Sequence, residues 1–170
     1  MFSPFNALAA ALWLYLPALI ANATPVLVGK AAFLAPYRIP IWEAGLGKNK
    51  SWAGLVIGVI AGTFAGWLQI ALTPWPYDPW LWIGWSAVIS FGALFADAAK
   101  SWFKRRIGIP PGGALPVVDG IDYVVGALVF GLVLFVPSWP VALALLIAGP
   151  ILSLLANIVS YSLGLKKVWY

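Results

Sequence analysis

The side chains best suited to chemistry lie in a single stretch of a chain that is otherwise mostly hydrocarbon. Asp97, Lys100 and Lys104 follow one another at spacings that place them on one face if the segment is a helix. Asp119 and Asp122 come after an intervening Pro/Gly loop and lie one helical turn apart. Charged groups are costly in an apolar chain, so this concentration marks the candidate site.

Oxygen atoms are the metal ligands that this chain offers, because it contains no cysteine and no histidine. The carboxylates of Asp97, Asp119 and Asp122 therefore predict a Mg²⁺ site, in which one or two carboxylates bind the ion and water and substrate phosphates complete its shell. In the structural alternative, Asp97 pairs with Lys100, and the other two aspartates are favoured by the dipole at the start of a helix. Three carboxylates together favour the metal.

Cations, hydroxyls and small residues suited to phosphate accompany these carboxylates. Those in the same stretch are Lys100, Ser101, Lys104, Arg105, Arg106, Gly112 and Gly113. An earlier loop contributes Lys48, Asn49, Lys50 and Ser51, just before a predicted helix whose N-terminus favours anions. Two plain alternatives stay open for that loop: Ser51 is an N-cap, and the lysines anchor the topology.

Asn22 is a further candidate, because it lies near the end of the first apolar run, just before the first basic loop. The run is interrupted there by Asn22 and by Thr24 with Pro25. The favoured interpretation is a kink whose freed backbone groups are satisfied by neighbouring helices. In the functional interpretation, the Asn22 amide lies at the mouth of the site.

Apolar runs must position these groups, and they make up most of the chain. The hydrophobic fraction is 63% and the charged fraction only 9%, against about 25% in soluble domains, which indicates an integral membrane protein. Runs near the roughly 20 residues that cross a bilayer predict five spans. The expected fold is an all-α bundle of five transmembrane helices, at about 5–28, 52–72, 80–99, 117–136 and 141–163, in one domain covering residues 1–170, with loops at 29–51 and 100–116.

The basic residues predict the orientation of this bundle. All ten lysines and arginines fall in the two long loops or at the C-terminus, and none in the short turns or at the N-terminus. By the positive-inside rule, the N-terminus is outside a cell membrane, and the C-terminus and the candidate site are cytoplasmic. The net charge of +5 is thereby explained by topology, and no nucleic-acid partner is expected.

The order of motifs resembles that of a known enzyme family. A serine, a Lys-Arg-Arg block, a Pro-Gly-Gly turn and two aspartates three apart form a pattern similar to the signature of the CDP-diacylglycerol synthases; here they are Ser101, Lys104 to Arg106, Pro111 to Gly113, Asp119 and Asp122. The short length and the run GKNKSWAG at 47–54 resemble their archaeal relatives, the CDP-archaeol synthases. Gly120 stands where the wider signature has an arginine, and no histidine precedes Gly112.

This resemblance implies a CTP-dependent cytidylyltransferase of membrane phospholipid biosynthesis. Its substrate would be an isoprenoid ether-lipid phosphate of the 2,3-bis-O-geranylgeranylglycerol 1-phosphate type, converted to a CDP-lipid with release of pyrophosphate among membrane lipids. The catalytic group expected on this basis is Asp97, Lys104, Asp119 and Asp122, with Mg²⁺ as the cofactor. The sequence carries no signal for an oligomeric state.

Two other classes of function compete with this interpretation. A small membrane transporter or channel with a cytoplasmic anion site would also need polar groups within its spans, yet the charges here are predicted to gather at one membrane face. A scaffold with basic lipid anchors would account for the loops and leave the three aspartates unexplained.

Overall fold

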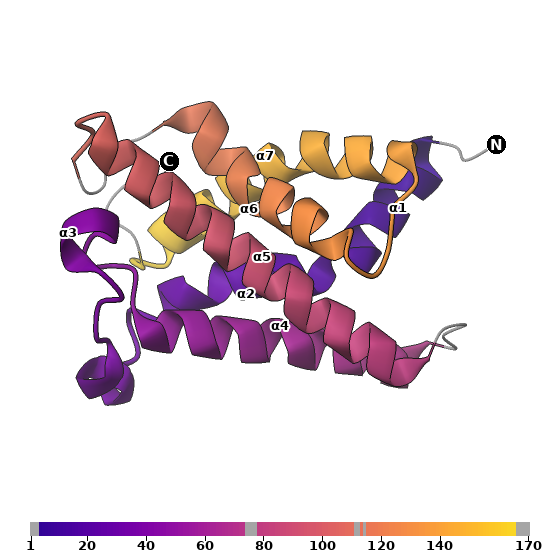
Figure 1. Cartoon of the computed structure of the whole chain (residues 1–170), viewed down its shortest axis with the longest axis horizontal. Coiled ribbons are helices and arrows are strands. Elements are labelled where there is room, and N and C mark those ends of the chain that lie inside the picture. The colour runs from indigo at the N-terminus through magenta and orange to yellow at the C-terminus, as the bar shows by residue number, and fades with distance from the viewer. Residues whose placement is uncertain (1–3, 74–77, 111–112, 114, 166–170) are drawn as a thin grey trace.

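The computed structural model of the chain describes residues 4–73, 78–110, 113 and 115–165. Within this part the regular elements are helices, together with one isolated β-bridge, which confirms the all-α class (Figure 1). The helices are α1 (Pro4–Leu14), α2 (Leu16–Val28), the 3₁₀ helix η1 (Ala32–Tyr37), α3 (Glu43–Leu46), α4 (Trp52–Leu72), α5 (Pro79–Arg106), α6 (Pro116–Gly131) and α7 (Trp139–Ser162).

The first apolar run is broken earlier than the sequence suggests. α2 continues as a helix through Asn22 and Pro25, where a kink was expected, and the chain bends by 55° earlier, between α1 and α2. Pro17 occupies the first turn of α2, where a missing N–H costs no helical hydrogen bond and the fixed φ suits a helix start. The Gln69 side chain of α4 donates to the Trp13 carbonyl at 2.5 Å, which satisfies a backbone acceptor near the break.

Three helices in the described part of the chain are long and apolar enough to cross a membrane, namely α4, α5 and α7, and the bent pair α1 and α2 makes up to four. The protein therefore contains several membrane-type helices. α6 is 16 residues long and ends at Gly131, before the predicted boundary at 136. Conversely, α5 extends through Arg106, so the predicted loop at 100–116 begins with helix.

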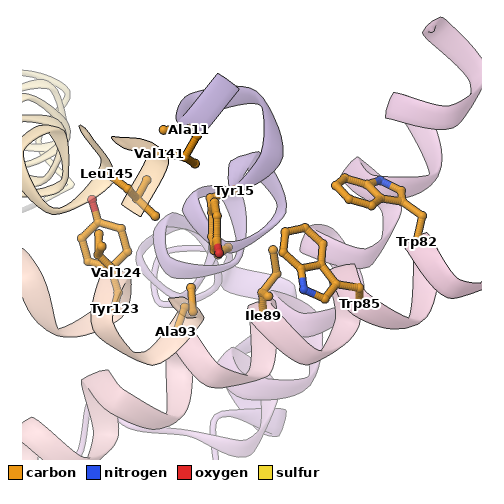
Figure 2. Close-up of a cluster of buried hydrophobic side chains, with 12 residues drawn as sticks. Ala11, Tyr15, Trp82, Trp85, Ile89, Ala93, Tyr123, Val124, Val141 and Leu145 are labelled. Carbon is orange, nitrogen blue, oxygen red and sulfur yellow. The ribbon is translucent and has the colours of Figure 1, made fainter. Parts of the chain in front are cut away.

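α5 is the central element of the packing. It runs obliquely across the molecule and packs against α2, α4 and α6 (Figure 1). Figure 2 shows the core beside it, with Tyr15 of the α1–α2 break standing next to Trp85 and Ile89 of α5. The Tyr15 and Trp85 rings meet edge to face, with centroids 5.3 Å apart. The Trp85 indole N–H donates to the Gly131 carbonyl at 3.1 Å, which fixes the end of α6 against α5.

Glycines let α5 and α6 approach closely. A Cβ atom at Gly92 of α5 would lie 2.6 Å from the Gly126 carbonyl oxygen, and one at Gly126 of α6 would lie 2.5 Å from the Ala96 Cβ. Small residues at such crossings allow backbones to touch, as in many membrane helix pairs. The end of α5 and the start of α6 thereby lie at the same end of the molecule (Figure 1). Their charged residues form ion pairs there.

Candidate active site

The Lys100 side chain of α5 is the centre of the site. Its Nζ atom lies 3.1 Å from Asp97 Oδ1, 3.2 Å from Asp119 Oδ1 and 2.8 Å from Asp122 Oδ2. The Lys100 side chain is 12% exposed and that of Asp122 only 6%. The structure thus brings the three predicted carboxylates together, around a lysine that the sequence assigned to phosphate binding.

Lys104 and Asp119 extend this cluster toward the start of α6. Lys104 Nζ donates to both carboxylate oxygens of Asp119, at 3.0 Å each. Asp119 Oδ2 also accepts a hydrogen bond of 2.6 Å from the Leu115 backbone N–H, which lies immediately before α6. Asp119 therefore satisfies a free donor at the helix start in addition to facing the cluster.

Lys50 joins the cluster from the first long loop by an ion pair with Asp97. The loop holds Lys50 in place, because the Ile41 N–H donates to the Lys50 carbonyl at 2.8 Å and Pro40 bridges to Ser51. Two loops that are distant in sequence consequently reach the same carboxylate. The structure thus places Lys50 beside the carboxylates, and its contact with a phosphate stays a prediction.

Other predicted phosphate-binding residues have structural partners or lie elsewhere. Ser51 is the N-cap of α4 and accepts from the Gly54 N–H at 3.1 Å, while Ser101 donates to the Asp97 carbonyl at 2.9 Å. Lys48 pairs with Glu43 at 3.4 Å on the surface and is 81% exposed.

Arg105 and Arg106 point away from the carboxylates. The Arg105 guanidinium donates to the Ile109 carbonyl, and that of Arg106 stacks over the Trp102 ring at 5.2 Å. Both arginines line a separate cavity of about 310 Å³ with Trp42 and Trp102. Nine positions along the helix place Arg106 opposite Asp97 on α5, whereas Arg105 is turned away by its bond to the Ile109 carbonyl.

The remaining predictions concern Asn22 and the Pro/Gly turn. Asn22 lies within α2, is half-buried, and does not line the cavity that Arg105 and Arg106 share. Gly113 donates its N–H to the Pro110 carbonyl at 2.9 Å, which closes a turn between α5 and α6. Gly112 lies outside the described residues.

A second cavity, of about 440 Å³, adjoins the Lys50–Asp97 pair. Its polar end is formed by Asn49, Lys50, Ser51 and Asp97, and its walls are mainly apolar, with Pro25, Leu55, Phe91, Leu94, Phe95 and Trp102 among them. Sequence reasoning missed this apolar wall. The spacing of Phe91, Phe95 and Trp102, at i, i+4 and i+11, is the signal that they share a helix face.

The donor chemistry of the cluster fits Mg²⁺. Carboxylate oxygens are the ligands that this ion prefers, and they converge here on a position that a cation, the Lys100 ammonium, already occupies. Asp122 Oδ2 is buried, and among the described residues its counter-ion is this ammonium. The contact between them does not have the geometry of a hydrogen bond. As arranged, no three acidic side chains of the described part are spaced to hold an ion by themselves.

Known proteins share this sequence and fold. A family model described as CarS-like, CDP-archaeol synthase, matches residues 5–170. The CDP-archaeol synthase of Thermococcus onnurineus is 36% identical, over 93% of this chain and 94% of the relative, and that of Methanococcus aeolicus is 32% identical, over 91% and 92%. A solved structure described as an intramembrane enzyme for archaeal membrane lipid biosynthesis is 35% identical, with a TM-score of 0.75 over 89% of this chain and 94% of the other.

Proposed function

The chain belongs to the CDP-archaeol synthase family, and from this premise we propose that it activates an isoprenoid ether-lipid phosphate with CTP. The products are a CDP-lipid and pyrophosphate. The observation that carries this proposal at the level of residues is the cluster of three aspartates and three lysines beside an apolar cavity at one end of the helix bundle. Neither a transporter nor a scaffold would explain why the chain belongs to this family or why a charged cluster lies beside an apolar cavity.

The reaction needs alignment and charge compensation more than a base. An oxygen of the lipid phosphate bonds to the α-phosphorus of CTP, and the bond from that phosphorus to the bridging oxygen of the β-phosphate breaks, so that pyrophosphate leaves with the electron pair. The attacking phosphate is already an anion, and no proton has to be removed from it. Lys50, Lys100 and Lys104 can bind the phosphate oxygens and hold the two anions in line.

Mg²⁺ belongs to this proposal as the cofactor, with Asp97, Asp119 and Asp122 as its protein ligands. When bound, it would neutralise charge on the triphosphate oxygens. Asp119 and Asp122 lie on the same face of α6, one turn apart, as two carboxylates that share one ion would require. Water and phosphate oxygens complete the shell in most protein Mg²⁺ sites.

The lipid substrate is assigned to the cavity of about 440 Å³. Its apolar walls suit a hydrocarbon chain, and its polar end contains Lys50 and Asn49, which suit a phosphate group. A phosphate bound there lies beside Asp97 and hence next to the cluster. The cavity accepts part of one isoprenoid chain, and the remainder stays in the bilayer.

Purified protein incubated with CTP, Mg²⁺ and an ether-lipid phosphate is expected to form pyrophosphate and a CDP-lipid in equal amounts. The matched control replaces the lipid phosphate by the same lipid with a free hydroxyl, which is a poor nucleophile without a base and should give neither product. Pyrophosphate without CDP-lipid would indicate hydrolysis of CTP. Absence of both products from folded, CTP-binding protein would refute the proposal.

For the topology we propose five spans, formed by α1 with α2, α4, α5, α6 and α7, with the N-terminus outside and the site in the cytoplasm. The distribution of the ten basic residues supports this orientation. The chain has no native cysteine, so Ser3→Cys and Ser162→Cys can each be labelled singly with an impermeant maleimide on intact cells and on inverted vesicles. The two positions should react from opposite sides. Reaction of both from one side would exclude an odd number of spans.

A further inference from the structure

The charges in the cluster balance without any added ion. Asp97 is paired with Lys50 and Lys100, and Asp119 with Lys100 and Lys104. Asp122 is paired with Lys100. Three carboxylates are thus matched by three ammonium groups, and no carboxylate in the cluster is left with an unbalanced charge that would attract a free divalent cation.

Lys100 also occupies the place where such a cation would have to bind. Its ammonium lies within 3.2 Å of all three carboxylates, in a side chain that is 12% exposed. A divalent ion held by two of these carboxylates would lie next to that ammonium in a partly buried site. Repulsion between the two cations is strong there, because water screens it poorly.

A nucleoside triphosphate removes this obstacle. Its phosphates carry several negative charges and provide acceptors for the lysine ammonium groups, so that the carboxylates become available to the ion. Building on the proposed function, we infer that the site takes up its divalent ion only together with the nucleotide, and that Lys100 enforces this order. Lys100 pairs with the carboxylates before the nucleotide binds and with the nucleotide's phosphates afterwards.

Binding of Mn²⁺, followed by the loss of its free electron paramagnetic resonance signal, tests this inference without turnover. Detergent-purified wild-type protein is titrated with Mn²⁺ alone and with a CTP analogue that has a methylene group between the α- and β-phosphorus, and the Mn²⁺ bound by the same analogue without protein is subtracted. We expect Mn²⁺ affinity to be at least about ten-fold higher with the analogue, the scale on which neighbouring groups alter metal affinity. Equal affinity with and without the analogue would overturn the inference.

Two variants test whether Lys100 is the residue that prevents Mn²⁺ from binding without nucleotide. Lys100→Met keeps the apolar stem and removes the charge, so it should bind Mn²⁺ without nucleotide about ten-fold or more tightly than the wild type. Lys30→Met, which removes an exposed lysine from the same loop as Lys50, should behave as the wild type. If Lys100→Met gains no affinity, the ammonium does not exclude the ion.

The wild-type comparison stands even if Lys100→Met does not fold. Different outcomes would refute the order of binding and the proposed function. Tight Mn²⁺ binding without nucleotide overturns the order of binding and leaves the proposed function intact. Absence of binding of both Mn²⁺ and the CTP analogue overturns the proposed function and the inference with it.

Discussion

Asp119→Asn and Asp122→Asn are each expected to reduce turnover below about a tenth of the wild-type rate, while the protein still inserts and purifies normally. Asparagine has nearly the same size as aspartate and removes only the charge. At position 119 it retains an oxygen that can accept from the Leu115 N–H, so the start of α6 is preserved. The rate of CDP-lipid formation in detergent measures the effect, and the elution profile on size exclusion reports folding.

Asp78→Asn is the matched control for these variants. Asp78 is the N-cap of α5, at the opposite end of this helix from the cluster, and its side chain accepts from the Trp80 and Leu81 N–H groups. Asparagine is as good an N-cap, so activity should be unchanged. If Asp119→Asn and Asp122→Asn both keep more than about a tenth of the wild-type turnover, the two aspartates only stabilise the start of α6.

Lys50→Ala is expected to weaken CTP binding ten-fold or more. A charge-assisted hydrogen bond is worth on the order of 1.5 to 3 kcal/mol, which corresponds to about one to two powers of ten in affinity. The Ile41 N–H holds the Lys50 backbone in position and the Lys50 ammonium pairs with Asp97 of the cluster, so this ammonium is preorganised for a triphosphate oxygen. Isothermal titration calorimetry with CTP and Mg²⁺ gives the dissociation constant.

Lys30→Ala separates this contact from the general positive potential of the basic surface around the site. Lys30 is exposed and belongs to the same loop as Lys50. The loss of affinity in this control should be less than about two-fold, because a solvent-exposed charge at a distance is screened by salt. If both variants lose affinity equally, a surface field attracts the nucleotide and the contact from Lys50 is not specific.

The sequence by itself determined the class of the protein and the identity of its chemical groups. A charged fraction of 9% leaves no soluble alternative, and the absence of histidine and cysteine restricts any metal site to oxygen ligands. Helical spacing alone placed Asp97, Lys100 and Lys104 on one face of α5. The same period places Arg106 on the opposite side of α5, while the direction of Arg105 depends on its bond to the Ile109 carbonyl.

Local backbone breaks were less predictable. Pro25 was the expected site of a kink, and α2 continues through it, as a membrane helix can when its neighbours satisfy the freed backbone groups. The bend lies instead between α1 and α2, where the Gln69 side chain from another helix satisfies the Trp13 carbonyl. A contact between residues so far apart in the chain leaves no local signal.

Only the tertiary structure decided how the charges pair. The placement of Lys100 among all three aspartates depends on the distance at which α5 and α6 cross, and that distance is set by backbone contact between Gly92 and Gly126. The position of Lys50 depends likewise on the β-bridge that folds its loop back onto α4. Spacing along one helix fixes which side chains share a face, whereas the identity of the groups opposite that face is a property of long-range packing.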